Sequence, residues 1–106
     1  MKLLTQADRK VLPDLYEQEE AGVDAVARVK WFTPDSNWTW YVSEFDGDDL
    51  CFGLVVGHEI ELGYFSLSEI SEVRGPLGLA VERDRYFMPA TLGLLMRREK
   101  EARGER

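Results

Sequence analysis

Apolar residues follow two different spacings along the chain, and the first is helical. Between residues 5 and 16 the apolar positions that fall at helical spacing are Val11, Leu12, Leu15 and Tyr16. Thr5 followed by Asp8 is a capping-box pattern, so we expect a helix to begin just after Thr5. Pro13 cannot continue this helix and predicts its end or a kink near Leu12.

From residue 25 onward the apolar period changes to two, which predicts strands. The four expected strands are "AVARVKWF" (25–32), "WTWYVSEF" (38–45), "LCFGLVVG" (50–57) and "HEIELGYF" (58–65). The turns between them are short, so we expect an antiparallel meander. The third run is almost continuously apolar, which indicates a central strand covered on both faces. On one of these faces Leu50, Phe52, Leu54 and Val56 are expected to be buried together.

The last part of the chain predicts two more helices. Ser66 with Glu69 forms a capping pattern for a short helix, and Pro89 fits the first position of a final one. The apolar side of that last helix is formed by Leu92, Leu95 and Met96. Between the helices, residues 75–89 carry glycine and proline breaks and are expected to wrap over the sheet.

These patterns together predict a single α+β domain. It consists of a four-stranded antiparallel meander with an N-terminal helix, a short helix after the fourth strand and a C-terminal helix. The globular part is expected to span residues 1–96, and residues 97–106 to form a charged tail. A chain of 106 residues suits one domain with one hydrophobic core.

Composition adds an expected location. No apolar run approaches the about 20 residues of a membrane-spanning helix, and the first ten residues lack the apolar core of a signal peptide. The single cysteine, Cys51, lies in an apolar segment and has no partner for an internal disulfide. We therefore expect a cytoplasmic protein, in the cytoplasm of a host cell, with Cys51 buried as a small apolar residue.

The net charge of −7 is unevenly distributed. Residues 1–96 hold 17 acidic and 8 basic side chains, and residues 97–106 hold 3 acidic and 5 basic ones. An acidic body repels nucleic-acid phosphates, so we expect no direct nucleic-acid binding and a protein partner with a basic surface. Acidic clusters at residues 14–24 and 44–49 fit that partner, or they simply keep the surface solvated.

The sequence contains few groups suited to catalysis. One histidine, His58, and one cysteine cannot form a histidine-rich zinc site. The turn "DGDD" begins like a calcium loop, but the twelfth position from Asp46 is Gly57 instead of glutamate. Phosphate-binding, dinucleotide-binding and Gly-x-Ser-x-Gly motifs are absent. We therefore predict no metal, no cofactor and no catalytic residue, and an enzyme is the less favoured interpretation.

The stretch "FTPDSNWTWY" (32–41) has two interpretations. Its aromatic side chains fill the core, or they form an interface hot spot rimmed by acids. The candidate partner-binding residues are Trp38, Trp40, Tyr41, Glu44, Asp46, Asp48 and Asp49. An alternative polar pocket would be built from Asp35, Asn37, His58, Glu59 and Arg74.

Four segments of the chain resemble one bacterial protein family. They are the leading "LLT", "FTPDSNWTWY" (32–41), "FGLVVGHEIELGYFSLSEI" (52–70) and "VRGPLGLAVERD" (73–84), and the family is DUF2958. The resemblance implies a gene carried by phages, plasmids and conjugative elements, often beside anti-restriction genes, and it assigns no catalytic residue.

Two functional hypotheses follow. The first is a small acidic protein of a mobile element that inhibits a host defence nuclease complex by protein–protein interaction, in the manner of anti-CRISPR or anti-restriction proteins. Its partner would be a CRISPR effector or a restriction enzyme subunit. The second is a small enzyme or ligand-binding module with a polar, aromatic pocket around Trp38, Trp40 and His58.

Overall fold

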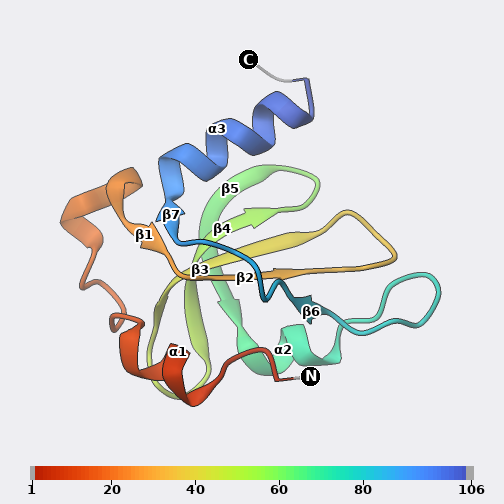
Figure 1. Cartoon of the computed structure of the whole chain (residues 1–106), viewed down its shortest axis with the longest axis horizontal. Coiled ribbons are helices and arrows are strands. Elements are labelled where there is room, and N and C mark those ends of the chain that lie inside the picture. The colour runs from red at the N-terminus through yellow and green to blue at the C-terminus, as the bar shows by residue number, and fades with distance from the viewer. Residues whose placement is uncertain (1, 105–106) are drawn as a thin grey trace.

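The computed structural model describes residues 2–104 and shows an α+β domain built on one main antiparallel sheet (Figure 1). The strand order in this sheet is β5-β4-β3-β2-β6. The strands are β2 (Val29–Phe32), β3 (Thr39–Phe45), β4 (Leu50–Val56), β5 (Ile60–Ser66) and β6 (Glu82–Arg83). The predicted meander is present as β2 to β5, but the sheet has five strands, so the prediction of four was wrong. A strand of two residues has no period to detect, which explains why β6 was missed.

The first predicted strand is divided between two sheets. β1 (Val26–Ala27) pairs with β7 (Ala90–Thr91) in a small second sheet, and β2 continues in the main sheet after Arg28. The alternation predicted for this run is confirmed, because Ala27, Val29 and Trp31 are buried. The segment expected only to wrap over the sheet, residues 75–89, therefore supplies β6 as the outer partner of β2, and β7 follows directly after this segment.

Four helical segments flank the sheets: α1 (Gln6–Val11), the 3₁₀ helix η1 (Glu19–Asp24), α2 (Leu67–Glu72) and α3 (Leu92–Ala102). Thr5 and Asp8 form the predicted capping box of α1, and Ser66 caps α2. Thr91 caps α3, so the helix does not begin at Pro89 as predicted. Within residues 2–104, no helix is both long and apolar enough to cross a membrane.

The end of α3 lies beyond residue 96, where the globular part was predicted to end. The helix continues to Ala102, so residues 97–102 of the predicted charged tail are helical. Arg103 follows at the C-cap and donates hydrogen bonds to the carbonyl oxygens of Gly57 at 2.8 Å and His58 at 3.0 Å. These bonds tie the end of the helix to the β4–β5 turn. Residues 105 and 106 of the predicted tail lie outside the described residues.

The core has two parts, one on each face of the main sheet. In Figure 1, α3 lies along the upper side of the sheet and α1 and α2 along its lower side. One part packs residues of the N-terminal segment and α2 against Trp31, Trp40, Val42, Cys51 and Phe65. The other packs Leu92 and Leu95 of α3 against Tyr41, Leu54 and Val56. The prediction of a central strand covered on both faces is confirmed, since β4 contributes to both parts.

One prediction for β4 was wrong in part. Leu54 and Val56 are buried, but Leu50 and Phe52 on the same face are only half-buried. Leu54 and Val56 are buried in one cluster with Leu92 and Leu95 of α3, whereas Phe52 packs against this cluster and also lines a pocket. Cys51 points to the other face and is fully buried. Its burial raises the pKa of the thiol to about 12, so the thiol stays protonated at neutral pH.

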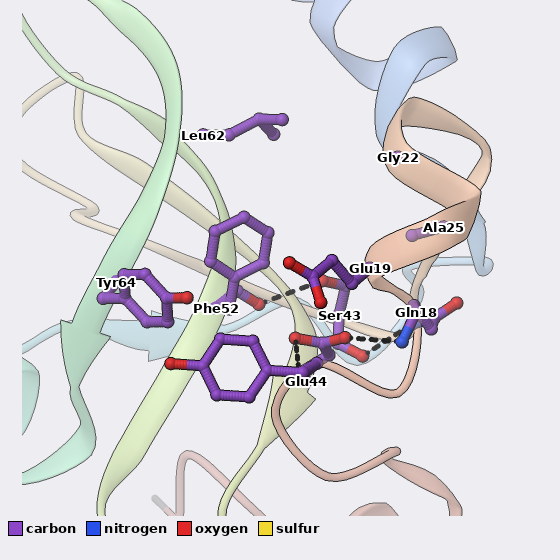
Figure 2. A pocket seen from close by; sticks show the side chains of 10 residues that line it. Gln18, Glu19, Gly22, Ala25, Ser43, Glu44, Phe52, Leu62 and Tyr64 are labelled. Carbon is purple, nitrogen blue, oxygen red and sulfur yellow. Dashed lines mark hydrogen bonds between the residues drawn. The ribbon is translucent and has the colours of Figure 1, made fainter.

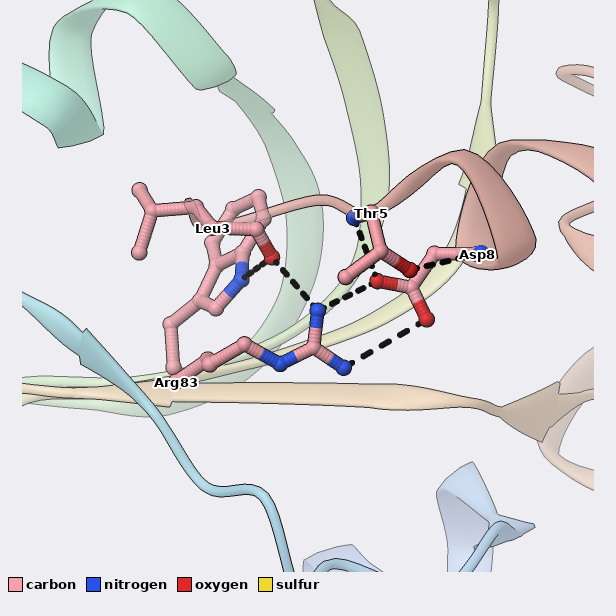
Figure 3. A network of polar contacts seen from close by, with 5 residues as sticks. Leu3, Thr5, Asp8 and Arg83 are labelled. Carbon is pink, nitrogen blue, oxygen red and sulfur yellow. Dashed lines mark hydrogen bonds and ion pairs between the residues drawn. The ribbon is translucent and has the colours of Figure 1, made fainter. Parts of the chain in front are cut away.

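A polar network connects the N-terminal segment to the outer strand β6 (Figure 3). Arg83 forms an ion pair with Asp8 and donates a hydrogen bond of 3.3 Å to the carbonyl oxygen of Leu3. Trp31 donates from Nε1 to the same oxygen at 2.8 Å. Asp8 also accepts from the backbone N–H of Thr5, at 2.8 Å. The network fixes the N-terminal segment over the edge of the sheet.

Candidate functional site

The aromatic strand is mainly part of the core. Trp40 and Tyr41 are 5% and 4% exposed and lie in the two different parts of the core. Trp38 is half-buried and stacks on Trp40, with ring centroids 5.9 Å apart and planes inclined by 25°. The core interpretation is therefore correct for Trp40 and Tyr41, and these two side chains do not offer a surface to a partner. Both faces of β3 are covered, which the residue pattern alone left open.

The acidic hairpin after this strand is mainly structural. Glu44 is only 4% exposed, so it was wrongly predicted as a surface residue. Asp46 accepts three backbone hydrogen bonds inside its own turn, and Asp49 accepts hydrogen bonds from Ser66 and Ser68 at the start of α2. These bonds lower the pKa of both aspartates. Asp48 is exposed. Asp46 thus holds the turn itself, and Asp49 links the turn to the start of α2.

The predicted polar pocket is only partly assembled. A groove of about 300 Å³ lies beside the two tryptophans. It is lined by Thr33, Ser36, Trp38, Trp40, Val73, Arg74, Gly75 and Pro76. Arg74 is thus present as predicted, but Asp35, Asn37, His58 and Glu59 do not line the groove.

Two of these four residues have other contacts. Asp35 accepts a backbone hydrogen bond of 2.8 Å from Leu77 and supports the loop there. The ring of His58 packs edge-on against Trp38, with centroids 5.4 Å apart. Asn37, His58 and Glu59 are exposed. The predicted polar residues therefore surround the tryptophans without converging on one cavity.

A second pocket lies between η1, the turn before it and the open end of β4 and β5 (Figure 2). Its volume is about 190 Å³. Its lining includes three aromatic rings, Tyr16, Phe52 and Tyr64, and two carboxylates, Glu19 and Glu44. Figure 2 shows Phe52 and Tyr64 on the sheet side of this pocket, Gln18 and Glu19 on the opposite side and Glu44 between them. We call Tyr16, Phe52 and Tyr64 the aromatic cluster.

Tyr16 reaches this position through an unusual backbone conformation. Its φ is 71°, in the left-handed region, and no other described non-glycine residue has a positive φ. Such a conformation costs an L-residue about 1–2 kcal/mol. The buried carboxylate of Glu44 holds it by accepting hydrogen bonds from the backbone N–H groups of Tyr16, at 3.0 Å, and Gln18, at 2.8 Å. The Gln18 side chain is fixed in turn by Ser43 and Val26.

The rings of the aromatic cluster are inclined to one another. Phe52 and Tyr64 are cross-strand partners with centroids 4.9 Å apart and planes at 60°. Tyr16 and Tyr64 have centroids 6.5 Å apart and planes at 57°. A hydrogen bond with Tyr16 raises the pKa of Tyr64, and so do its loss of water contact and the nearby charges of Glu44 and Glu19. The Tyr64 phenol is therefore neutral at physiological pH, and it lies in the negative electrostatic potential of the two glutamates.

Sequence reasoning missed the aromatic cluster. It placed Tyr16 in a helical pattern and Phe52 in the core, and it gave Tyr64 no role. The available signals were weak: Phe52 and Tyr64 occupy opposed positions on neighbouring strands, and Glu19 belongs to an acidic cluster. Within residues 2–104, no group of three or more His, Cys, Asp or Glu side chains is arranged to hold a metal ion.

The fold and this pocket define a class of small α+β domain, in which one face of an antiparallel sheet carries an acidic, aromatic-lined pocket. The family described as "Protein of unknown function (DUF2958)" matches residues 3–101, and the chain belongs to it. The resemblance found in the sequence is thereby confirmed. No curated protein and no solved structure matches the chain.

Proposed function

We propose that this protein acts by binding a protein partner with a basic surface, as an inhibitor of a host defence nuclease complex of the CRISPR or restriction type. The pocket of the aromatic cluster is its main structural support. Tyr16 and Tyr64 are 61% and 51% exposed and lie beside carboxylates. Exposed tyrosines next to a concave site are typical of interface hot spots.

Charge supports a basic protein as the partner. Acids of the cluster at residues 14–24 that are exposed around Tyr16 include Glu17, Glu19, Glu20 and Asp24. Together with the net charge of −7, they attract a basic surface and speed the encounter with it. Of the two acidic clusters that the sequence suggested for a basic partner, we therefore favour the one at residues 14–24 over the hairpin at residues 44–49. A nuclease offers a suitable target, because the channel that holds its nucleic acid is basic. The family resemblance, which implies genes often found beside anti-restriction genes, supports a defence nuclease as this target.

The proposal is tested by capture followed by an activity assay. The tagged protein is incubated with host lysate, and the captured proteins are identified by mass spectrometry. Each captured nuclease is then purified and assayed for DNA cleavage with increasing amounts of this protein. We expect cleavage to fall as this protein approaches equimolar amounts.

Two charge-reversal variants make this assay specific. Glu17→Lys with Glu20→Lys, beside the pocket, is expected to abolish inhibition. Glu69→Lys with Glu72→Lys, on exposed positions of α2, is the matched control and is expected to inhibit normally. Full cleavage in the presence of excess wild-type protein, or capture of no nuclease at all, would contradict the proposal.

The groove beside Trp38 and Trp40 supports a second candidate, a ligand-binding module or small enzyme. The half-buried indole of Trp38, backed by Trp40 and next to Arg74, offers a surface suited to a small planar anion. A set of aromatic carboxylates is added to the protein, and its thermal stability is measured. A rise in Tm that disappears in Arg74→Ala would favour this candidate, and no rise with any compound would remove it.

A further inference from the structure

We infer that the aromatic cluster, together with Glu19 and Glu44, binds the guanidinium group of an arginine side chain. That the arginine belongs to a protein partner rests on the proposed function, whereas the chemistry of the pocket stands independently of it. The pocket is thus a specific recognition site within a broader acidic surface.

The aromatic rings provide faces for a cation. A cation is attracted by the face of a phenylalanine or tyrosine ring when it lies within about 6 Å of the ring centroid. The three rings are consecutive neighbours, with centroid distances of 4.9 and 6.5 Å, and adjacent planes are inclined by 60° and 57°. One group in the pocket can therefore contact more than one ring. The volume of about 190 Å³ suits the end of a single side chain.

The carboxylates make the pocket selective for positive charge. Glu19 and Glu44 line it, and no lysine or arginine is found among its described lining residues. Both oxygens of Glu44 accept backbone hydrogen bonds, which keeps this carboxylate in place. Glu19 is exposed, and its oxygens are free to turn toward a ligand. Hydrogen bonds in which both groups are charged are about twice as strong as neutral ones.

Guanidinium fits these features better than ammonium. It is planar and weakly hydrated, it stacks on aromatic faces, and its fork of N–H groups matches a carboxylate. A lysine ammonium is compact and strongly hydrated, so the partly open pocket would remove its water at a higher cost.

The strain at Tyr16 supports a binding role for the pocket. A buried glutamate is used to hold a non-glycine residue at a φ of 71°, although glycine would adopt this conformation freely. The result is an aromatic ring held 6.5 Å from Tyr64 and still 61% exposed. Residues held in such conformations cluster at functional sites.

Binding of small amides tests the inference directly. N-acetyl-arginine amide, N-acetyl-lysine amide and N-acetyl-citrulline amide are titrated into the protein while the aromatic NMR signals are followed. Citrulline has the shape of arginine without its charge. We expect saturable shifts of the Tyr16, Phe52 and Tyr64 ring signals with arginine, weaker binding of lysine and none of citrulline.

Three variants localise the binding. We expect Glu19→Gln to weaken arginine binding about tenfold, because a charged hydrogen bond is lost. Tyr64→Leu is expected to weaken it about twofold to fivefold, the size of a cation–π contact at an exposed site. Tyr86→Leu removes a tyrosine that is 86% exposed elsewhere on the surface and is the matched control, with unchanged binding. Backbone NMR spectra confirm that each variant is folded.

The outcomes separate this inference from the proposed function. Citrulline or lysine binding as strongly as arginine, or arginine binding unaffected by both pocket variants, would overturn the inference. Arginine binding in the pocket, with no nuclease captured or inhibited, would contradict the proposed function alone. Inhibition of a nuclease that survives Glu19→Gln and Tyr64→Leu, without any arginine binding, would contradict the inference alone.

Discussion

The two faces of the main sheet are covered to different extents. The face that carries Trp31 and Trp40 is covered by the N-terminal segment and α2, and its polar groups bond to each other. On the other face α3 packs over Leu54 and Val56, while the end at Phe52 remains open to the pocket. The first face contributes mainly stability, and the second leaves room for binding.

Two carboxylates, Asp8 and Glu44, show the same contrast. Asp8, on the closed side, pairs with Arg83 and caps α1, so it joins two elements of the core scaffold. Glu44, beside the pocket, bonds to the backbone of Tyr16 and Gln18 and holds a strained turn. One acid stabilises the fold, and the other positions a side chain at the candidate site. Substitutions on the two faces are therefore expected to separate stability from binding.

The largest loss of stability is expected for Trp31→Ala, on the sheet face that the N-terminal segment and α2 cover. The indole is fully buried, packs edge-on against Phe65 at 6.0 Å and donates a hydrogen bond to Leu3. Its removal is expected to lower the free energy of unfolding by about 3–5 kcal/mol, a large part of the stability of a small domain. Urea denaturation followed by circular dichroism measures this change. An unfolding free energy within 1 kcal/mol of wild type would show that this face is not the main source of stability.

A smaller loss is expected for Glu44→Ala. The variant leaves the backbone N–H groups of Tyr16 and Gln18 without their acceptor, at a cost of about 1–3 kcal/mol. Hydrogen exchange of these two amides should become faster, and arginine amide should no longer bind. Ser71→Ala, which removes an exposed hydroxyl on α2, is the control with little change. Unchanged exchange at Tyr16 would mean that Glu44 does not hold the turn.

A loss of stability at acidic pH is expected from protonation of the Asp8 carboxylate. Burial alone would raise the pKa of Asp8, but hydrogen bonds from Arg83 and Thr5 outweigh it and hold the pKa below its ordinary value of 3.8. The ionised carboxylate therefore stabilises the fold above about pH 4, and this contribution disappears as the pH falls through the lowered pKa.

The comparison of wild type with Asp8→Asn isolates this effect, because Asp46 and Asp49 also have lowered pKa values and are present in both proteins. Urea midpoints are measured for both proteins from pH 7 to pH 2.5. We expect the wild type to be more stable at pH 7 and the difference to shrink toward pH 2.5. A difference that stays constant over this range would contradict the role assigned to Asp8.

The smallest effect on stability is expected for Tyr16→Gly. Glycine relieves the strain at a φ of 71° but gains more freedom in the unfolded chain, so the unfolding free energy should change by less than about 1 kcal/mol. Arginine binding should be lost, because one ring of the aromatic cluster is gone. Tyr64→Gly, at a strand position without positive φ, is the contrasting variant and should destabilise the protein. A clear loss of stability in Tyr16→Gly would show that the ring serves the fold.

The sequence predicted the helix caps and the strand alternation, because these features depend on interactions between residues that are close in the chain. The caps at Thr5 and Ser66 and the alternation of Ala27, Val29 and Trp31 depend on neighbouring residues, and they are present. The two-residue strands were not predictable in this way, because they form only by pairing with distant strands.

The candidate site was hidden for a related reason. Its rings come from positions 16, 52 and 64, and no short stretch of sequence contains two of them. The positive φ of Tyr16 depends on a carboxylate 28 residues away. The sequence instead indicated the aromatic run at residues 32–41 as a candidate interface, but its buried aromatic side chains belong to the core. A binding residue that is far from its neighbours in sequence leaves no local pattern.

The outer strand β6 has a consequence for how the protein is made. Its residues, Glu82 and Arg83, pair with Phe32 and Trp31 of β2, and Arg83 also holds Asp8. A ribosome delivers β2 some 50 residues before its outer partner, so the nascent chain carries a bare strand edge for nearly half of this sequence. Translation that stops before residue 82 would release a sheet ready to pair with another copy. Once β6 and Arg83 have been synthesised, β6 can pair with β2 and protect this strand edge from aggregation.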